Sequence, residues 1–306
     1  MNNGKKISAW IGDLMLFIAA LVWGGGFVGV KESLNTLSPF YMIGIRFAIA
    51  SVLLILVFWK QVKEITKEEV QYGSLVGLFL FLGFAFQTTG AIYLEMSKLA
   101  FLTALNVIMV PFLVRVVFKE PIKKYNLVAS FIAMVGFAFL NFSTTTGLTI
   151  GWGEVLGVVG AVGFAAHITS VGHFSKKVEP IRLAVIQMVI CSILGFVIAI
   201  PFETPPKTIN LEMLVPILYL GIFSTCIAFL FQTVGQKYTS APRAAIILCM
   251  ESVFGTLFSV LFFKEVITVY MVIGAALIMM GVVLSEYMHA RGQEASSQEE
   301  KLRKAI

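Results

Sequence analysis

The sequence predicts an all-α integral membrane protein of ten transmembrane helices, built as two inverted five-helix repeats. Composition, the spacing of apolar runs and an internal repeat lead to this prediction. Of the 306 residues, 58% are apolar and only 13% are charged, and the mean hydropathy is +0.91. Soluble domains are about 45–50% apolar and about 25% charged, so an ordinary water-soluble core could not hold the excess. A large soluble domain is therefore excluded.

Ten apolar runs divide the chain, and each is close to the roughly 20 residues that a membrane-spanning helix needs. We do not expect the first run to be a cleaved signal peptide, because it contains Asp13 and a glycine-rich stretch in place of a small-residue cleavage site. Pro39 and Pro180 lie at run ends, where a missing N–H is harmless, whereas Pro111 is interior and is expected to kink its helix. The runs lie near residues 9–30, 39–59, 71–93, 98–118, 124–141, 152–174, 181–201, 212–234, 242–263 and 267–289.

The basic residues predict the orientation, because short loops rich in Lys and Arg stay cytoplasmic. If the N-terminus is inside, the outer segments contain only Lys31, Lys98, Lys207 and Lys264. We therefore expect a multi-pass protein of the plasma membrane with both termini in the cytoplasm. The charged tail, residues 290–306, is expected to be cytoplasmic and either mobile or a short surface helix.

An internal repeat relates the two halves of the chain. Residues 84–120 align without a gap with residues 229–265, and an earlier stretch aligns Asp13 with Glu154 and Trp23 with Phe164. We expect the repeats to occupy residues 9–142 and 152–289. Because five spans is an odd number, the second copy enters the membrane from the opposite side, an arrangement that suits alternating access. The matched pairs of the later stretch include Phe84/Phe229, Gln87/Gln232, Thr88/Thr233, Gly90/Gly235 and Tyr93/Tyr238.

Short motifs are spread along both repeats: Trp23-Gly24-Gly25-Gly26-Phe27, Pro39-Phe40-Tyr41 with Arg46-Phe47, Ala100-Phe101-Leu102-Thr103, Val110-Pro111-Phe112-Leu113, Lys119-Glu120 and Glu251-Ser252-Val253-Phe254. From about residue 9 to 287, the chain resembles the EamA-domain members of the drug/metabolite transporter superfamily. The resemblance implies ten helices in two inverted units that move small metabolites, often exporting amino acids. Ser252 stands where the family frequently has Pro, so this helix is expected to lack the usual kink.

Glu251 is the first candidate for binding a substrate, because an ionisable group far from the membrane interface is costly. It lies about halfway along the ninth run, and its repeat partner is Asn106 in the middle of the fourth run. Two polar groups at related depths would suit a central site, with Glu251 binding a cationic group or taking up a proton. The alternative is that Glu251 only links helices through hydrogen bonds.

Arg46 is the second charged candidate, and its repeat partner is Gln187. If Arg46 faces a cavity, its guanidinium would suit a carboxylate or phosphate, and together with Glu251 it would match a zwitterion. The alternative is a structural clamp that binds backbone carbonyls or a carboxylate.

Further candidates are His167, Trp23, Phe164 and Thr103. A histidine such as His167 can titrate near neutral pH and carry a proton, although a lone histidine is more often a packing residue. Trp23 and Phe164 would form a wall for a cation or an apolar group, or serve packing alone. Thr103 belongs to one of the shared motifs.

Gly24, Gly25 and Gly26 permit a hinge or an unwound turn, although close packing is the alternative, since each glycine costs a helix interior about 1 kcal/mol. On the sixth run, a packing stripe is expected from small residues four positions apart, Gly153, Gly157, Ala161 and Ala165.

Other polar residues are expected near the membrane faces. Gln87 and Gln232 are expected near opposite membrane faces. Asp13 and Glu154 are expected to be charges at helix N-termini. The pairs Lys119-Glu120 and Lys264-Glu265 are expected at the membrane interface.

These observations favour a secondary transporter, expected to be an exporter, of a small polar metabolite such as an amino acid or organic cation. A lipid-linked substrate carrier or flippase on the same scaffold is the alternative. An enzyme or ATP-driven pump is not expected, because the sequence has no Walker motif, no His-Glu-x-x-His and no nucleophile motif. A membrane receptor without a transport cycle is the remaining class.

The expected partners are the small-molecule metabolite and the lipid bilayer, in a monomer or homodimer. No nucleic-acid partner is expected, because the basic residues are scattered. No metal or other cofactor is expected, since all three cysteines lie inside apolar runs without ligand spacing. Proton coupling through Glu251 and facilitated diffusion are equal alternatives.

Overall fold

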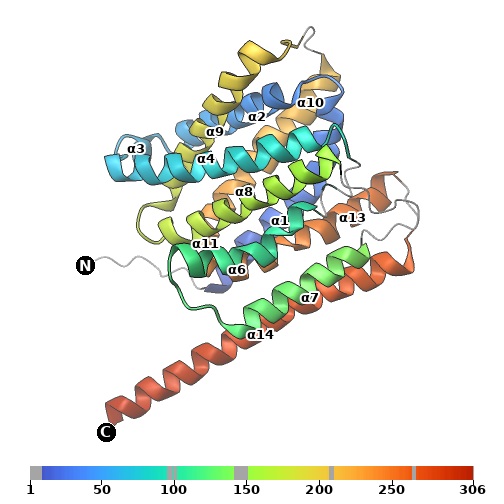
Figure 1. Ribbon diagram of the computed structural model, residues 1–306. Coiled ribbons are helices and arrows are strands. Elements are labelled where there is room, and N and C mark those ends of the chain that lie inside the picture. The colour runs from blue at the N-terminus through green and yellow to red at the C-terminus, as the bar shows by residue number, and fades with distance from the viewer. Residues whose placement is uncertain are drawn as a thin grey trace.

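The computed structural model describes residues 9–94, 99, 102–140, 151–206, 210–263 and 267–305, which form helices and no strand. The helices pack side by side into one bundle (Figure 1). In chain order the elements are α1 (Ala9–Leu34), α2 (Pro39–Val57), α3 (Trp59–Val62), α4 (Lys67–Gly90), α6 (Asn106–Val117), α7 (Lys124–Leu140), α8 (Trp152–Phe174), α9 (Pro180–Phe202), α10 (Leu211–Tyr219), the π-helix η1 (Leu220–Ile227), α11 (Ala228–Gln236), α12 (Ala241–Leu248), α13 (Met250–Phe263) and α14 (Val269–Ala305).

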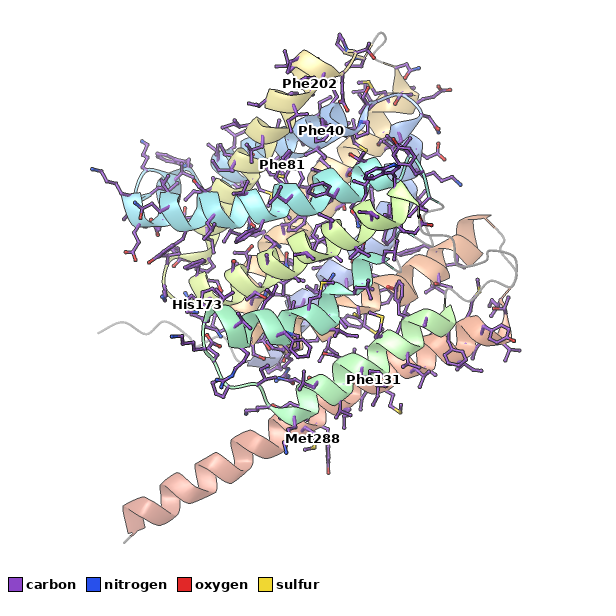
Figure 2. All side chains as sticks on the ribbon, viewed as in Figure 1. Phe40, Phe81, Phe131, His173, Phe202 and Met288 are labelled. Carbon is purple, nitrogen blue, oxygen red and sulfur yellow. The ribbon has the colours of Figure 1, made fainter. Side chains whose placement is uncertain are left out.

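The membrane character of the chain is confirmed. Within the described residues, 7 helices are long and apolar enough to cross a membrane, and three shorter apolar helices cover Leu102–Val117, Lys124–Phe139 and Val269–Ser285. Large apolar side chains such as Phe131 and Phe202 point away from the bundle, where lipid would cover them (Figure 2). Because three helices are shorter than a full span, the number ten stays a prediction.

Several helices begin where local chemistry requires it. Pro39 and Pro180 each stand at the first helical positions of α2 and α9, as the sequence predicts. Thr66 begins α4 with a capping box, in which its hydroxyl accepts from the amide of Glu69 and the Glu69 carboxylate accepts from the amide of Thr66.

Two helices are interrupted at related places. The fourth apolar run breaks at Leu105, before α6, and the ninth breaks at Cys249, between α12 and α13. The expectation that Ser252 leaves the ninth helix without the usual kink stays a prediction. At Cys249 the backbone changes to the i→i−3 hydrogen bonds of a 3₁₀ turn without a proline, and the amide of Ser252 donates to the carbonyl of Cys249. Pro111 lies inside α6, beyond the interruption at Leu105.

The C-terminal tail does not form a separate segment. Helix α14 continues from Val269 to Ala305 and extends beyond the rest of the bundle (Figure 1). Glu, Gln, Lys, Arg and Ala dominate its last turns, and these residues favour helix wherever no packing decides otherwise.

Close helix contacts repeat between the two halves. Helices α7 and α14 lie side by side (Figure 1), and a Cβ at Gly136 would lie 2.7 Å from the Gly274 carbonyl oxygen. A Cβ at Gly281 would lie 2.9 Å from the Ala129 carbonyl oxygen. When the repeat alignment is continued at the same offset of 145 residues, Gly281 corresponds to Gly136 and Gly274 to Ala129, so the two contacts are reciprocal. Small residues permit this close approach of membrane helices.

The expected packing stripe on α8 is confirmed. Gly153, Gly157, Ala161 and Ala165 are all buried. A Cβ at Gly153 would meet the side chain of Leu94, and a Cβ at Gly157 would meet the side chain of Leu102.

Candidate functional site

One cavity of about 110 Å³ lies between the helices of both repeats. It brings together all seven residues that the sequence nominates for substrate binding, from the broken fourth and ninth runs and from α1, α2 and α8. They are Trp23, Arg46, Thr103, Asn106, Phe164, His167 and Glu251. Residues far apart in the chain thus line one space, although their binding of a substrate stays a prediction.

Two aromatic pairs form a wall of this cavity. Trp23 and Phe229 lie 4.8 Å apart between ring centroids, and Phe164 and Phe84 lie 5.1 Å apart. The repeat alignment relates Trp23 to Phe164 and Phe229 to Phe84, so these contacts are reciprocal as well. Phe84 and Phe229 then meet each other, with centroids 5.9 Å apart.

Arg46 is held firmly at the edge of the cavity. Its side chain is only 2% exposed; Nε donates to Thr225 Oγ1 over 2.8 Å and Nη2 donates to Ser224 Oγ over 3.2 Å. The guanidinium carbon lies 4.7 Å from the centroid of the Phe84 ring. Within the described part of the chain no carboxylate forms an ion pair with Arg46. The guanidinium is thus clamped by neutral groups, and it is still available to an anion that enters the cavity.

The π-helix η1 supplies both hydroxyls that hold Arg46. A proline inside α10, Pro216, precedes the change of register to η1. The carbonyl oxygen of Ser224 also accepts a 2.7 Å hydrogen bond from Trp23 Nε1. Short π-helical segments are rare and frequent at functional sites.

Glu251 lies in the first turn of α13 and lines the cavity. Asn106, its repeat partner, begins α6 and donates from Nδ2 to the carbonyl of Thr103 over 2.9 Å. Both residues therefore follow the one-residue turns at Leu105 and Cys249, and both line the same cavity.

His167 is part of a buried chain of hydrogen bonds. Its Nε2 lies 2.8 Å from Gln187 Oε1, while Gln187 Nε2 donates to Thr233 Oγ1 over 2.8 Å and Thr233 donates to the Phe229 carbonyl over 2.7 Å. Since the Gln187 amide donates to Thr233, its oxygen accepts from His167, which assigns the ring proton to Nε2. This network supports the packing interpretation of His167, whereas a proton-carrying role stays a prediction.

The three consecutive glycines of α1 each face a different neighbour. A Cβ would lie 2.6 Å from Phe254 Cβ at Gly24, 2.5 Å from Tyr219 Oη at Gly25, and 2.9 Å from Ser224 Oγ at Gly26. Helix α1 is continuous through them. The geometry supports close packing, and a hinge at this place stays a prediction.

The residues described contain no group of three or more His, Cys, Asp or Glu side chains that could hold a metal ion.

The profile of the EamA-like transporter family matches residues 10–142 and again residues 151–287. The chain belongs to the EamA-like transporter family. An uncharacterized transporter of Archaeoglobus fulgidus is 34% identical over 283 residues, which are 92% of this chain and 88% of that protein. The chain is thus a transporter, as the sequence motifs indicate.

More distant relatives agree with this assignment. The uncharacterized transporter YyaM of Bacillus subtilis is 24% identical over 88% of this chain and 92% of its own length. Protein PagO of Salmonella typhimurium is 21% identical over 79% of this chain and 81% of its own length. A crystal structure of 17% identity superposes with a TM-score of 0.78 over 92% of this chain and 98% of that chain, which shows a shared fold.

Several residues that line the cavity were not nominated for it from the sequence. Gln87 and Gln232, expected near opposite membrane faces, both line the cavity, and Gln87 Nε2 donates to Thr103 Oγ1 over 3.1 Å. Phe84 and Phe229 were matched in the repeat, and their identity in both copies was a signal that could have nominated them. Ser224 and Thr225 gave no such signal, because their role depends on the π-helical register.

Asp13 is more than a charge at a helix N-terminus. Its Oδ2 lies 2.7 Å from Nη2 of Arg243 on α12.

Glu120 contacts His173, with 3.3 Å between Glu120 Oε1 and His173 Nδ1. Lys264 and Glu265, like Ala100 and Phe101, lie outside the described residues.

Proposed function

We propose that this transporter exports a small polar metabolite, such as an amino acid or organic cation, by alternating access around the cavity. The observation that carries the proposal is the convergence of Glu251 and Arg46, with the aromatic pairs, on one cavity between the repeats. A carboxylate and a guanidinium in one site suit a zwitterion best, because each pole of the substrate would meet an opposite charge.

The size of the cavity supports a small substrate. About 110 Å³ is less than the 150 Å³ or so of an engineered cavity that accommodates benzene. A long lipid-linked substrate would need a larger space open to the bilayer, so the carrier or flippase alternative receives no support from this volume.

We propose further that the helices form ten spans in two inverted repeats, with both termini in the cytoplasm. Two sets of reciprocal contacts support a pseudo-twofold axis. The contact of Gly136 with Gly274 has its counterpart in the contact of Gly281 with Ala129. The contact of Trp23 with Phe229 has its counterpart in the contact of Phe164 with Phe84. Such an axis in the membrane plane lets rocking of the repeats expose one site to either side.

The proposal is tested by uptake of a panel of amino acids and organic cations into proteoliposomes, with and without a pH gradient. We expect the wild type to move a zwitterion, and Glu251→Gln to lower its uptake at least tenfold, because the ammonium loses its charged partner. Glu212→Gln, the same exchange at an exposed carboxylate on α10 that does not line the cavity, serves as the matched control and should retain uptake.

The same uptake measurements also decide whether transport is coupled to protons. If Glu251 carries the coupled proton, the pH gradient stimulates the wild type but not Glu251→Gln, whereas facilitated diffusion gives uptake that ignores the gradient. Uptake equal to that of protein-free liposomes for every compound would contradict the proposed function.

A further inference from the structure

On α1 and α4 the lining of the cavity extends towards one end of the bundle. On α1 its lining runs from Trp23 to Val30, towards the end of that helix, and on α4 from Phe84 to Ala91, again towards the helix end. These helix ends are on the same side of the bundle, because α1 and α4 both enter from the side predicted to be cytoplasmic.

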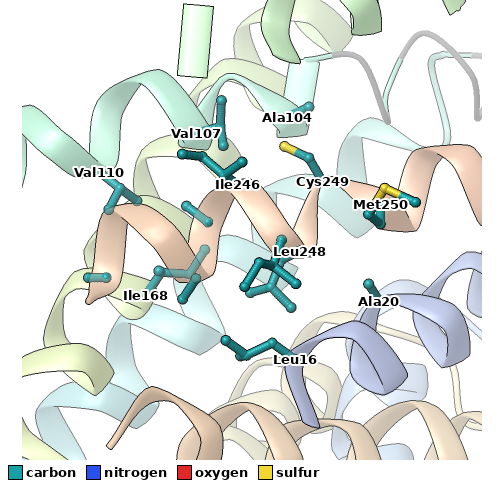
Figure 3. Close-up of a cluster of buried hydrophobic side chains, with 14 of the residues drawn as sticks. Leu16, Ala20, Ala104, Val107, Val110, Ile168, Ile246, Leu248, Cys249 and Met250 are labelled. Atoms are coloured by element: carbon teal, nitrogen blue, oxygen red, sulfur yellow. The ribbon is translucent and has the colours of Figure 1, made fainter. Parts of the chain in front are cut away.

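The other end is closed by packed apolar side chains. Leu16 and Ala20 of α1 pack in one buried cluster with Ile168 of α8 and with Ile246 and Leu248 of the α12 segment (Figure 3). Among these, Leu16, Ala20 and Ile246 are 0% exposed. Ile168 and Leu248 also line the cavity, so this packed cluster forms its wall on that side.

An ion pair lies beyond this cluster, where α1 and α12 begin. Asp13 Oδ2 and Arg243 Nη2 are 2.7 Å apart, and the two side chains are only 13% and 6% exposed. Asp13 belongs to the first half of the chain and Arg243 to the second. Next to this pair, a Cβ at Gly12 would lie 2.9 Å from the Gly235 carbonyl oxygen, so the halves touch closely here.

We propose that Asp13 and Arg243 are gating residues, whose ion pair locks this end of the transporter shut while the cavity faces the other end. The inference rests on the proposed alternating-access function. For the closed end to open, α1 must separate from α12, and that movement must break the pair.

An ion pair suits a lock that has to release. Two buried charges attract strongly, yet the cost of removing them from water offsets most of that gain. When the gate opens, both groups become hydrated again, so the pair can favour the closed state without making it permanent. An apolar contact of the same kind would lose hydrophobic stabilisation on opening and gain nothing in return.

Cys249 provides a native reporter, because it lines the cavity and only Cys191 and Cys226 accompany it in the sequence. With Cys191→Ala and Cys226→Ala as background, a charged, membrane-impermeant methanethiosulfonate is added to inside-out or right-side-out vesicles. The labelling rate of Cys249 then reports how often each end is open.

We expect Asp13→Asn and Arg243→Gln each to raise labelling from the Asp13 side about tenfold, the change that loss of one charge-assisted hydrogen bond produces. The exchange Asp13→Arg with Arg243→Asp should return the rate towards that of the background protein. Lys237→Gln is the matched control, because the Lys237–Glu179 pair spans 4.0 Å with side chains 33% and 41% exposed, and its loss should leave labelling unchanged.

Labelling of the single variants at the background rate would overturn the lock. So would an exchange variant that labels as fast as the single variants, because the increase would then reflect general loosening. Counterflow by the same proteins keeps the two proposals apart: a background protein that moves no substrate contradicts the proposed function, while the change in labelling still decides the lock.

Discussion

At the scale of single residues, the site depends on how Arg46 is held. A guanidinium 2% exposed would be costly without partners, and it obtains them from Thr225, Ser224 and the face of Phe84. These neutral groups fix its position without cancelling its charge. The arrangement differs from the ion pair of Asp13 with Arg243, in which each charge is compensated by its partner.

Thr225→Val tests this clamp. The valine removes the acceptor of the Arg46 Nε bond at a residue that is 0% exposed, so a charged donor is left unpaired. We expect the free energy of unfolding to fall by about 1–3 kcal/mol, measured as a lower melting temperature of the detergent-purified protein. Thr225→Ser retains the hydroxyl and should stay close to the wild type, and equal melting of the valine variant and the wild type would contradict the clamp.

At the scale of elements, irregular helices build the cavity wall. The π-helix η1, the break at Leu105 and the break at Cys249 each lie beside the cavity, whereas α2 and α9 run uninterrupted. Breaks in the backbone are tolerated in a membrane only where protein or a cavity covers the freed polar groups. The close packing of α1 against α13 determines at which positions of these two helices only glycine fits.

Gly24→Ala is expected to be destabilising for that reason. The new Cβ would lie 2.6 Å from Phe254 Cβ and 2.8 Å from the Gly255 backbone nitrogen, and a backbone atom cannot rotate away. We expect a loss of about 1–3 kcal/mol, again measured by thermal unfolding.

Gly255→Ala is the control for this prediction, on the facing helix. Its new Cβ would have Phe27 Cδ2 as nearest neighbour at 3.5 Å, an ordinary contact, and alanine favours helix over glycine. A Gly24 variant as stable as the Gly255 variant would show that the two helices are not packed as described.

At the scale of the whole molecule, the two halves are related by reciprocal contacts. Corresponding residues of the two halves make corresponding contacts, between α7 and α14 and in the aromatic pairs, as a twofold relation requires. Yet the cavity lining extends towards one end on α1 and α4, whereas the Asp13–Arg243 ion pair lies where α1 and α12 begin, so the present conformation is not fully symmetric. An asymmetric state of a symmetric scaffold is what alternating access needs.

The proposed orientation can be checked with fusions at both termini. Because Lys and Arg concentrate in the segments expected inside, alkaline phosphatase fused at either end should be inactive and green fluorescent protein fused there should fluoresce. A phosphatase fused after Leu34, in the segment expected outside, should be active. Opposite activities at the two termini would contradict an even number of spans.

The sequence by itself determined the membrane environment, the repeat and the family, because hydropathy, the positions of Lys and Arg and repeated residues are local properties of the chain. It also nominated the polar residues of the cavity, since an ionisable group such as Glu251 is costly inside an apolar run.

Only the tertiary structure decided which of these residues meet. The π-helical register brings Ser224 and Thr225 to Arg46, the break at Cys249 forms without proline, and Asp13 finds Arg243 across the two halves. These features depend on packing between helices far apart in sequence, and the local sequence indicates such packing only where small residues recur, as they do on α8. The reason is physical: in a membrane almost every helix is apolar, so hydropathy can say which segments are buried in the bilayer but not which neighbours they contact.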